Sequence, residues 1–374
     1  MTAVIRRRRI GDRALLPIAL LLAGCPQRLD DDFRVRVSAA ENPDAGPNVG
    51  GGITPGPTGD AGSVGPGPGP GPAPGPGPDS GPGTPPVILG SVPGDGAVGV
   101  LPDATVTLTF SAPMDRASVE AAYRSSDLPA GSVSFAWSDG DRVLRIQPNA
   151  VLRTNAGTDP ASVGAVSYAV ELAAGARDAA GNGLAPARIA FSTARAISQD
   201  IGAVTNRDLT GNWRSDSTYG LADCERIDTT VCMGDSPAAG EPAYRGFMTF
   251  DLRALPANLI AIDAAELSCT IALVYGTPFT NLGALNIDHV TFDSIGDAAF
   301  NAAPLPEHQS HTTPMIIGDV LAIDALAAVR ADWTVRDYSQ YRLAFSTATD
   351  GDASADQLGC DWSTLKLALS YWVP

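Results

Sequence analysis

The acidic loop between residues 350 and 361 carries the side-chain pattern that most directly suggests chemistry. Oxygen-bearing side chains stand at alternate positions, at Asp350, Asp352 and Asp356, and Asp361 follows. Carboxylates that converge in this way bind a hard cation such as Ca²⁺. A solvated acidic turn is the alternative, because the glycine that calcium loops place at the sixth position is missing. These four residues are therefore candidate ligands of a structural calcium ion, and we expect no other cofactor.

Four thiols in the C-terminal part of the chain predict two disulfides. They are Cys224, Cys232, Cys269 and Cys360. Cysteines of an exported protein oxidise, and sequence alone allows three pairings. Cys224 and Cys232 are close neighbours in a polar segment, so a small local loop is expected, which leaves Cys269 with Cys360. A zinc site is the alternative, although no Cys-x-x-Cys pair occurs.

The fifth cysteine, Cys25, closes a short export signal. A basic run (residues 6–9) precedes an apolar stretch (residues 14–22) that is too short to span a bilayer, which takes about 20 residues. The segment Leu22-Ala23-Gly24-Cys25 resembles a bacterial lipobox. That resemblance implies cleavage after residues 1–24, a lipoprotein signal peptide, and a diacylglycerol on Cys25. An ordinary secretory signal with a chance cysteine is the alternative.

The export signal also predicts a location. Pro26 follows Cys25. In the enteric lipoproteins that the lipobox resembles, an Asp at this position favours the inner membrane. We therefore expect an exported protein, lipid-anchored in the outer membrane and facing the periplasm or the cell surface. Its first partner is the membrane, which it contacts through the N-terminal lipid.

Catalytic patterns are scarce in this sequence. It contains no Gly-x-Ser-x-Gly elbow, no His-Glu-x-x-His motif and no phosphate-binding loop. The histidines His289, His308 and His311 would bind a metal only if all three converged, and we expect His289 in a strand and the other two in a polar loop. We therefore predict that the protein is not an enzyme. The alternative is a polysaccharide hydrolase, which would need acidic side chains that face each other across a groove.

Two tryptophans near the C-terminus are candidates for ligand binding. Trp372 has the opposite parity to Tyr371 in the last predicted strand, so it should point away from the core. Trp362 lies close to Cys360 and shares the same candidate rim. Sugar rings stack on such side chains. Local packing is the alternative for both, since large aromatic residues are usually buried.

The elements that must position these residues are predicted to be strands. Apolar and polar residues alternate with a period of two, as in half-buried antiparallel strands. The clearest alternating runs cover residues 105–110, 144–147, 168–172, 189–191, 267–275, 341–345 and 365–373. Turn-forming clusters separate them, and residues 325–330 are rich in helix formers. The chain is thus predicted to be all-β, with a β-sandwich at 86–196 and a jelly-roll-like double sheet at 200–374.

Residues 25–85 are predicted to be a disordered, lipid-anchored linker. Gly and Pro dominate from residue 42 to residue 85 with a period of two, whereas collagen needs Gly at every third position.

The whole chain has a net charge of −16 and a single lysine. Such acidity argues against nucleic acid as a partner.

The segment 86–196 resembles the bacterial Ig-like domain first described in surface-layer proteins. The resemblance rests on Val92-Pro93-Gly94-Asp95-Gly96-Ala97, on residues 106–115, on Trp137, on residues 144–148, and on residues 178–182 and 189–193. It implies a non-catalytic spacer or adhesion module.

The segment 200–374 is similar to the DNRLRE family of exported β-domains. The similarity rests on residues 244–252, the pair Leu255-Pro256, and residues 262–267, 340–345 and 367–371. Some members of that family are carbohydrate-binding modules attached to polysaccharide-degrading enzymes. We therefore expect a non-catalytic cell-envelope lipoprotein that presents a binding or adhesion domain to polysaccharide or other envelope components. A polysaccharide-degrading enzyme and a purely structural envelope component are the alternatives.

Overall fold

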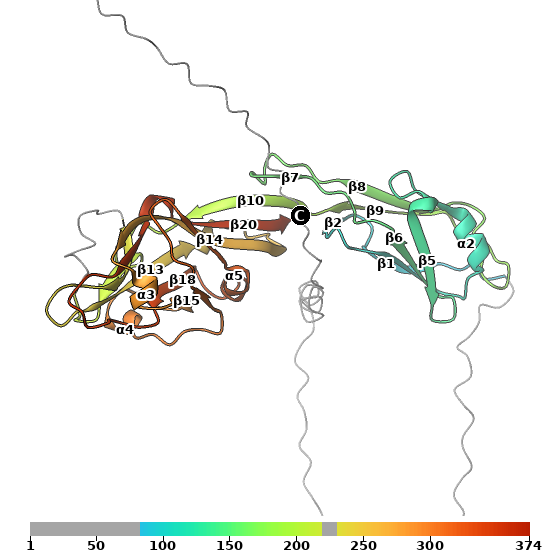
Figure 1. Ribbon diagram of the computed structural model, residues 1–374. Coiled ribbons are helices and arrows are strands. Elements are labelled where there is room, and N and C mark those ends of the chain that lie inside the picture. Colours follow the sequence, from blue (N-terminus) through green and yellow to red (C-terminus); the bar gives the residue numbers. More distant parts are fainter. Residues whose placement is uncertain (1–82, 219–229) are drawn as a thin grey trace, which may run out of the picture. The chain divides into compact units, whose positions relative to one another are not determined.

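The chain is nearly all β-structure, as the alternating sequence predicts. The computed structural model describes residues 83–218 and 230–374 (Figure 1). The two largest hydrophobic cores lie within residues 106–191 and within residues 197–373. The predicted signal peptide, nearly all of the predicted linker, Cys25 and Cys224 lie outside the described residues. Within the described ranges, no helix has the length and apolar character needed to cross a membrane.

The first core belongs to a sandwich of two four-stranded sheets. One sheet has the order β1-β3-β6-β5 and the other β2-β9-β8-β4, in which only β2 and β9 are parallel. The elements are β1 (Ile88–Val92), β2 (Ala97–Val100), β3 (Val106–Phe110), α2 (Arg116–Ala122), β4 (Tyr123–Arg124), η1 (Ala130–Ser132), β5 (Val133–Ser138), β6 (Val143–Pro148), β7 (Ala156–Gly157), β8 (Ser167–Leu172) and β9 (Ala187–Thr193).

Alternation explains how this sandwich closes. Leu108 of β3 lies opposite Leu144 of β6, and Tyr168 of β8 lies opposite Phe191 of β9. All four side chains are buried, and the Tyr168 and Phe191 rings stack with centroids 5.7 Å apart. The predicted Ig-like sandwich is therefore present.

The second core lies inside one large sheet that folds back on itself. Its strands run in the order β16-β15-β18-β13-β12-β19-β14-β20-β10-β7, with β11 paired to β13 and β17 paired to β14. The elements are β10 (Arg195–Gly202), β11 (Gly211–Arg214), β12 (Thr230–Asp235), β13 (Ala243–Asp251), η3 (Leu252–Ala254), β14 (Ala261–Tyr275), α3 (Pro278–Asn281), β15 (Leu285–Val290), α4 (Asp297–Phe300), β16 (His308–His311), β17 (Val320–Asp324), α5 (Leu326–Asp332), β18 (Tyr338–Phe345), β19 (Gln357–Asp361), η4 (Trp362–Thr364) and β20 (Lys366–Val373).

The long strand β14 joins the two layers of this domain. Its first part, up to Ser268, pairs with β20, and its last part, from Ile271, pairs with β19. Figure 1 shows β10, β20 and the start of β14 in one layer, with β13, β18 and β15 in the other. The core fills the space between them, with Leu367 and Met248 among its fully buried residues. This is the predicted double-sheet β-domain, closed by a strand that belongs to both layers.

Two local elements bear on the sequence predictions. The helix expected at 325–330 is present as α5, where Val329 is buried and Arg330 donates to the Ile262 carbonyl. The polar loop expected around His308 and His311 is instead the edge strand β16, paired with β15. Edge strands with only polar residues carry no alternation, so the sequence pattern does not reveal them.

Candidate metal centre and candidate binding face

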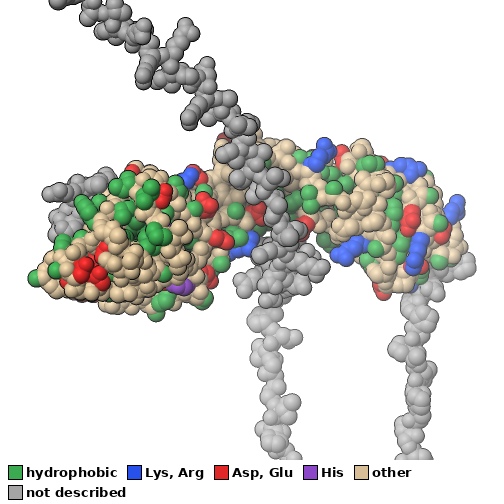
Figure 2. All heavy atoms as spheres, viewed as in Figure 1, with side chains coloured by type: hydrophobic (Ala, Val, Ile, Leu, Met, Phe, Trp, Pro, Cys, Tyr) green, Lys and Arg blue, Asp and Glu red, His purple; other side chains and the backbone are tan. Residues whose placement is uncertain are grey.

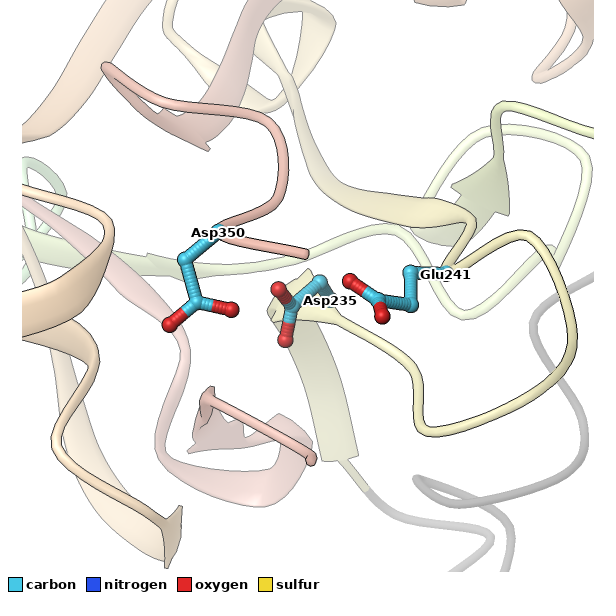
Figure 3. A group of neighbouring side chains, drawn as sticks. All are labelled: Asp235, Glu241 and Asp350. Carbon is cyan, nitrogen blue, oxygen red and sulfur yellow. The ribbon is translucent and has the colours of Figure 1, made fainter. Parts of the chain in front are cut away.

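Five carboxylates gather at one end of the C-terminal domain. One oxygen of each of Asp235, Glu241 and Asp350 lies within 4.8 Å of the other two (Figure 3). The same condition holds for Asp350, Asp352 and Asp356. Asp350 belongs to both groups and links them. We call these five residues the acidic cluster.

Strand pairing fixes the centre of the acidic cluster. Asp235 ends β12, and its preceding residue Gly234 pairs with Gln357 at the start of β19. The Asp235 amide donates to the Asp356 carbonyl at 3.0 Å, and the Asp356 amide donates to Asp235 Oδ1 at 2.9 Å. Gly234 has a φ of +132°, and a Cβ there would collide with the Asp356 carbonyl oxygen. A glycine is required for this close approach of the two strands.

Glu241 ties the two loops of the cluster together. It lies in the turn before β13 and accepts hydrogen bonds from the Ala353 amide at 2.7 Å and from the Thr349 hydroxyl at 2.6 Å. Both donors belong to the loop between β18 and β19. Glu241 has a φ of +43°, a conformation that only a minority of non-glycine residues adopt. The loop geometry thus holds a carboxylate against the β18–β19 loop although the two segments are more than a hundred residues apart.

Asp235 and Asp356 are the buried members of the cluster, and Asp235 is the more deeply buried. The Asp235 side chain is fully shielded from solvent, and its Oδ2 has no hydrogen-bond partner within the part of the chain that the structure describes. Burial raises the pKa of Asp235. The backbone amides of Asp356 and Asp350 oppose this effect, and the charges of the Asp356 and Asp350 side chains add to it. Figure 3 shows the Asp235 carboxylate between those of Asp350 and Glu241.

No cation compensates the cluster among residues 83–218 and 230–374. The ion pairs of those residues involve other carboxylates. Figure 2 shows Asp and Glu side chains gathered on the visible face of the C-terminal domain. Two of the five carboxylates are buried, Glu241 is half-buried, and Asp350 and Asp352 are exposed. Such a set of oxygen ligands, with no positive partner among the described residues, has the donor chemistry of a hard divalent cation site.

The structure brings three of the four predicted calcium ligands together. Asp350, Asp352 and Asp356 share the cluster, and Asp356 is fixed by the Thr277 amide and the Asn281 side chain. Asp361 lies elsewhere: it caps η4, where its Oδ1 accepts from the amide and hydroxyl of Ser363. Asp361 closes strand β19, and five extended residues at about 3.3 Å each carry it away from the loop.

Sequence reasoning missed Asp235 and Glu241. Both come from the β12–β13 connection, far from the acidic loop along the chain, and no motif links the two segments. Only the pairing of β12 with β19 brings them together. The one local signal of this pairing is Gly234, where a side chain would collide with the Asp356 carbonyl oxygen.

Two of the three histidines, His289 and His308, are held in networks with carboxylates. His289 is 1% exposed; its Nδ1 lies 2.9 Å from Glu307 Oε2 and its Nε2 lies 2.7 Å from Asp332 Oδ2. His308 Nδ1 lies 2.8 Å from Asp288 Oδ1. In the described ranges, the groups of side chains close enough to share a metal contain no histidine. A cavity of about 220 Å³ opens beside His289 and Glu307.

The disulfide expected between Cys269 and Cys360 is present. It joins β14 to β19 with Cα atoms 5.6 Å apart. Cys232 of β12 is also disulfide-bonded, whereas its expected partner Cys224 lies outside the described residues.

Trp372 lies on the outer face of the β10-β20-β14 layer. The odd-numbered residues of β20 from Leu367 to Val373 are buried, and Trp372 is half-buried on the opposite side. Its cross-strand neighbours are Ala196 and Ala261. The next two rows are Ser198-Ser370-Ala264 and Asp200-Ala368-Glu266. We call these three rows the outer face. Trp362, in contrast, packs partly against the second core.

Comparison with known proteins supports the Ig-like part of the chain. Residues 82–193 match the bacterial Ig-like domain family. None of the curated proteins is similar enough to the chain to match it.

Solved structures give only distant matches. An L,D-transpeptidase from Mycobacterium smegmatis is 16% identical, covers 62% of this chain and 77% of its own, and has a TM-score of 0.21. The S-layer protein rSbsC is 10% identical over 64% of this chain and 32% of its own, with a TM-score of 0.21. The protein SGBP-B of the Bacteroides ovatus mixed-linkage glucan utilization locus, in complex with a mixed-linkage heptasaccharide, is 10% identical over 72% of each chain, with a TM-score of 0.14. At these TM-scores the matches carry no argument about function.

Proposed function

We propose that this chain is a non-catalytic, exported cell-envelope protein that is anchored by a lipid on Cys25 and binds polysaccharide through its C-terminal domain. The Ig-like sandwich serves as a spacer between the anchored linker and that domain. The family match of residues 82–193 supports the spacer role and an extracellular location. The resemblance of the C-terminal segment to exported β-domains supports the binding role.

The observation that carries the proposal is the position of Trp372 on the outer face. A half-buried indole stands among alanine and serine side chains, which are too short to cover it. An indole ring stacks on the apolar side of a sugar ring, and the hydroxyls of Ser198 and Ser370 can bond to sugar hydroxyls. The outer face runs along three paired strands, so it suits an extended polymer better than a small ligand.

Charge favours a neutral polysaccharide over an acidic one. The single lysine, Lys366, is on this face and lies 2.9 Å from Asp200, and Glu266 is close by. The chain as a whole carries a charge of −16. A polyanion would therefore be repelled at low ionic strength, since exposed charges interact over a Debye length of about 10 Å at 0.1 M salt.

The test is a titration of the purified full chain with neutral β-glucan, neutral mannan and alginate, followed by tryptophan fluorescence and by affinity electrophoresis. We expect a neutral polymer to bind, Trp372→Ala to weaken that binding about tenfold or more, and Trp372→Phe to retain most of it, since one stacking contact contributes roughly 0.5–1.5 kcal/mol beyond its buried area. Val335→Ala, which shortens an exposed apolar side chain outside this face, is the matched control.

Two results would refute the proposal. Equal affinity of the wild type and Trp372→Ala for every polymer would remove the outer face as the binding surface. Release of reducing ends from any bound polymer would favour the alternative, a polysaccharide-degrading enzyme, over a non-catalytic module.

A further inference from the structure

Among residues 83–218 and 230–374, no cationic side chain forms an ion pair with the acidic cluster. Asp235, Glu241 and Asp350 place three carboxylate oxygens within 4.8 Å of one another. Like charges at such distances repel, and the repulsion grows where the surroundings exclude water. The hydrogen bonds that reach Glu241 and Asp235 Oδ1 come from neutral donors.

An independent observation points to a ligand at this place. Asp235 Oδ2 is buried and has no hydrogen-bond partner within residues 83–218 and 230–374. A buried carboxylate oxygen without a partner costs free energy, and proteins rarely keep one without an ion or water to satisfy it. The oxygen belongs to the carboxylate that Figure 3 places between the carboxylates of Glu241 and Asp350.

We propose that Asp235, Glu241 and Asp350 bind one calcium ion that joins the β12–β13 connection to the β18–β19 loop. Calcium takes six to eight oxygen ligands in flexible geometry, so Asp352 and water complete the shell. Magnesium fits less well because it demands a near-ideal octahedron and keeps much of its own water. The ion stabilises the domain because it compensates the repulsion between carboxylates of two chain segments, whose hydrogen bonds to each other come from neutral donors.

This site differs from the one that the acidic loop alone suggests. Asp235 and Glu241 take the place of Asp361 in the set of ligands. The ion bridges two chain segments, whereas a calcium-binding loop would enclose the ion within one segment. The inference does not depend on polysaccharide binding, because the cluster and the outer face share no residue.

The experiment measures calcium binding to the purified full chain. After treatment with EDTA and its removal, ⁴⁵Ca equilibrium dialysis should give one site per chain with a Kd on the order of 10⁻⁴ M. At about 100-fold excess over that Kd, calcium should raise the Tm of the C-terminal domain by roughly 5–10 °C. Magnesium at the same concentration should raise it less.

Asp235→Asn and Glu241→Gln test the ligands with nearly isosteric changes. Both should lose the calcium-dependent shift in Tm and bind calcium at least tenfold more weakly. In EDTA, Asp235→Asn should be at least as stable as the wild type, because it removes a buried charge and keeps the Oδ1 that accepts from the Asp356 amide. The matched control Asp361→Asn should retain the full calcium response.

Three outcomes would overturn the proposal. One is the absence of a calcium-dependent shift in the wild type. Another is an equal shift in the wild type, Asp235→Asn and Glu241→Gln. The third is a loss of the shift in Asp361→Asn alone, which would place the ion at the other end of β19. A larger response to magnesium than to calcium would overturn the choice of ion.

Discussion

His289 shows how a single buried side chain makes stability depend on pH. Both ring nitrogens lie within hydrogen-bond distance of carboxylates, Glu307 and Asp332, and ionised carboxylates only accept. Both nitrogens therefore carry protons. Burial lowers the pKa of His289, but the hydrogen bonds and charges of Asp332 and Glu307 outweigh it, and the pKa is raised overall.

This arrangement predicts a loss of stability above neutral pH. The contribution of His289 is complete below the unfolded pKa of about 6.5 and is lost as the pH rises through the raised folded pKa. The lowered pKa of Glu307 acts only in the acid range. His289→Gln should destabilise the domain by roughly 2–4 kcal/mol at pH 6, since Arg336 still pairs with Asp332. Urea unfolding from pH 6 to 9 should show a flatter profile for this variant; an unchanged slope would contradict the prediction.

At the same scale, the sequence predicts residues within one loop better than residues that meet across loops. The alternating carboxylates of Asp350, Asp352 and Asp356 do converge, because a short loop brings alternate side chains together. Asp235 and Glu241 escape prediction, since their proximity depends on strand pairing. The outward position of Trp372 follows from parity alone, because the period of a strand is fixed.

Among the elements, the disulfide between Cys269 and Cys360 lies where β14 changes partners. β14 pairs with β20 up to Ser268 and with β19 from Ile271, and Cys269 is between them. The bond closes a separation of 91 residues, which is worth roughly 4–5 kcal/mol in the chain-entropy treatment.

The double variant Cys269→Ala/Cys360→Ala should therefore destabilise the C-terminal domain by several kcal/mol, about that entropic contribution. Cys224→Ala/Cys232→Ala is the matched control; if these two cysteines pair as the sequence predicts, their short loop makes the loss smaller. Urea unfolding of the full chain measures both, and non-reducing peptide mapping identifies the bonds. A peptide that links Cys224 to Cys360 would refute the pairing.

Strands that alternate were predictable, whereas their partners were not. The periods in β3, β8, β14 and β20 identify half-buried strands. The same pattern does not predict that β14 pairs with β20 in one layer and with β19 in the other. Tyr275, at its end, continues the alternation of its inward face, yet it is exposed because the strand has left the core there.

At the scale of the whole molecule, attachment to the membrane is the prediction that the sequence makes most directly, although Cys25 lies outside the described residues. The resemblance of Leu22-Ala23-Gly24-Cys25 to a lipobox predicts that this attachment is made by a lipid on Cys25. A single acyl chain binds a membrane only marginally, with an association constant of about 10⁴ M⁻¹, whereas the diacylglycerol of a lipoprotein adds further buried methylenes at about 0.8 kcal/mol each.

Cys25→Ser should therefore move the protein from the membrane to the soluble fraction and abolish metabolic labelling with fatty acid, while the folded domains keep their Tm. Pro26→Ser alters the neighbouring position and spares the thiol, so it should stay in the membrane and remain labelled. Fractionation, labelling and thermal unfolding of the three proteins distinguish loss of the anchor from loss of folding. If Cys25→Ser stays in the membrane, the lipid on Cys25 is not what holds the protein there. Residues 25–85 would then not be the tether that sets where the outer face can meet its polysaccharide.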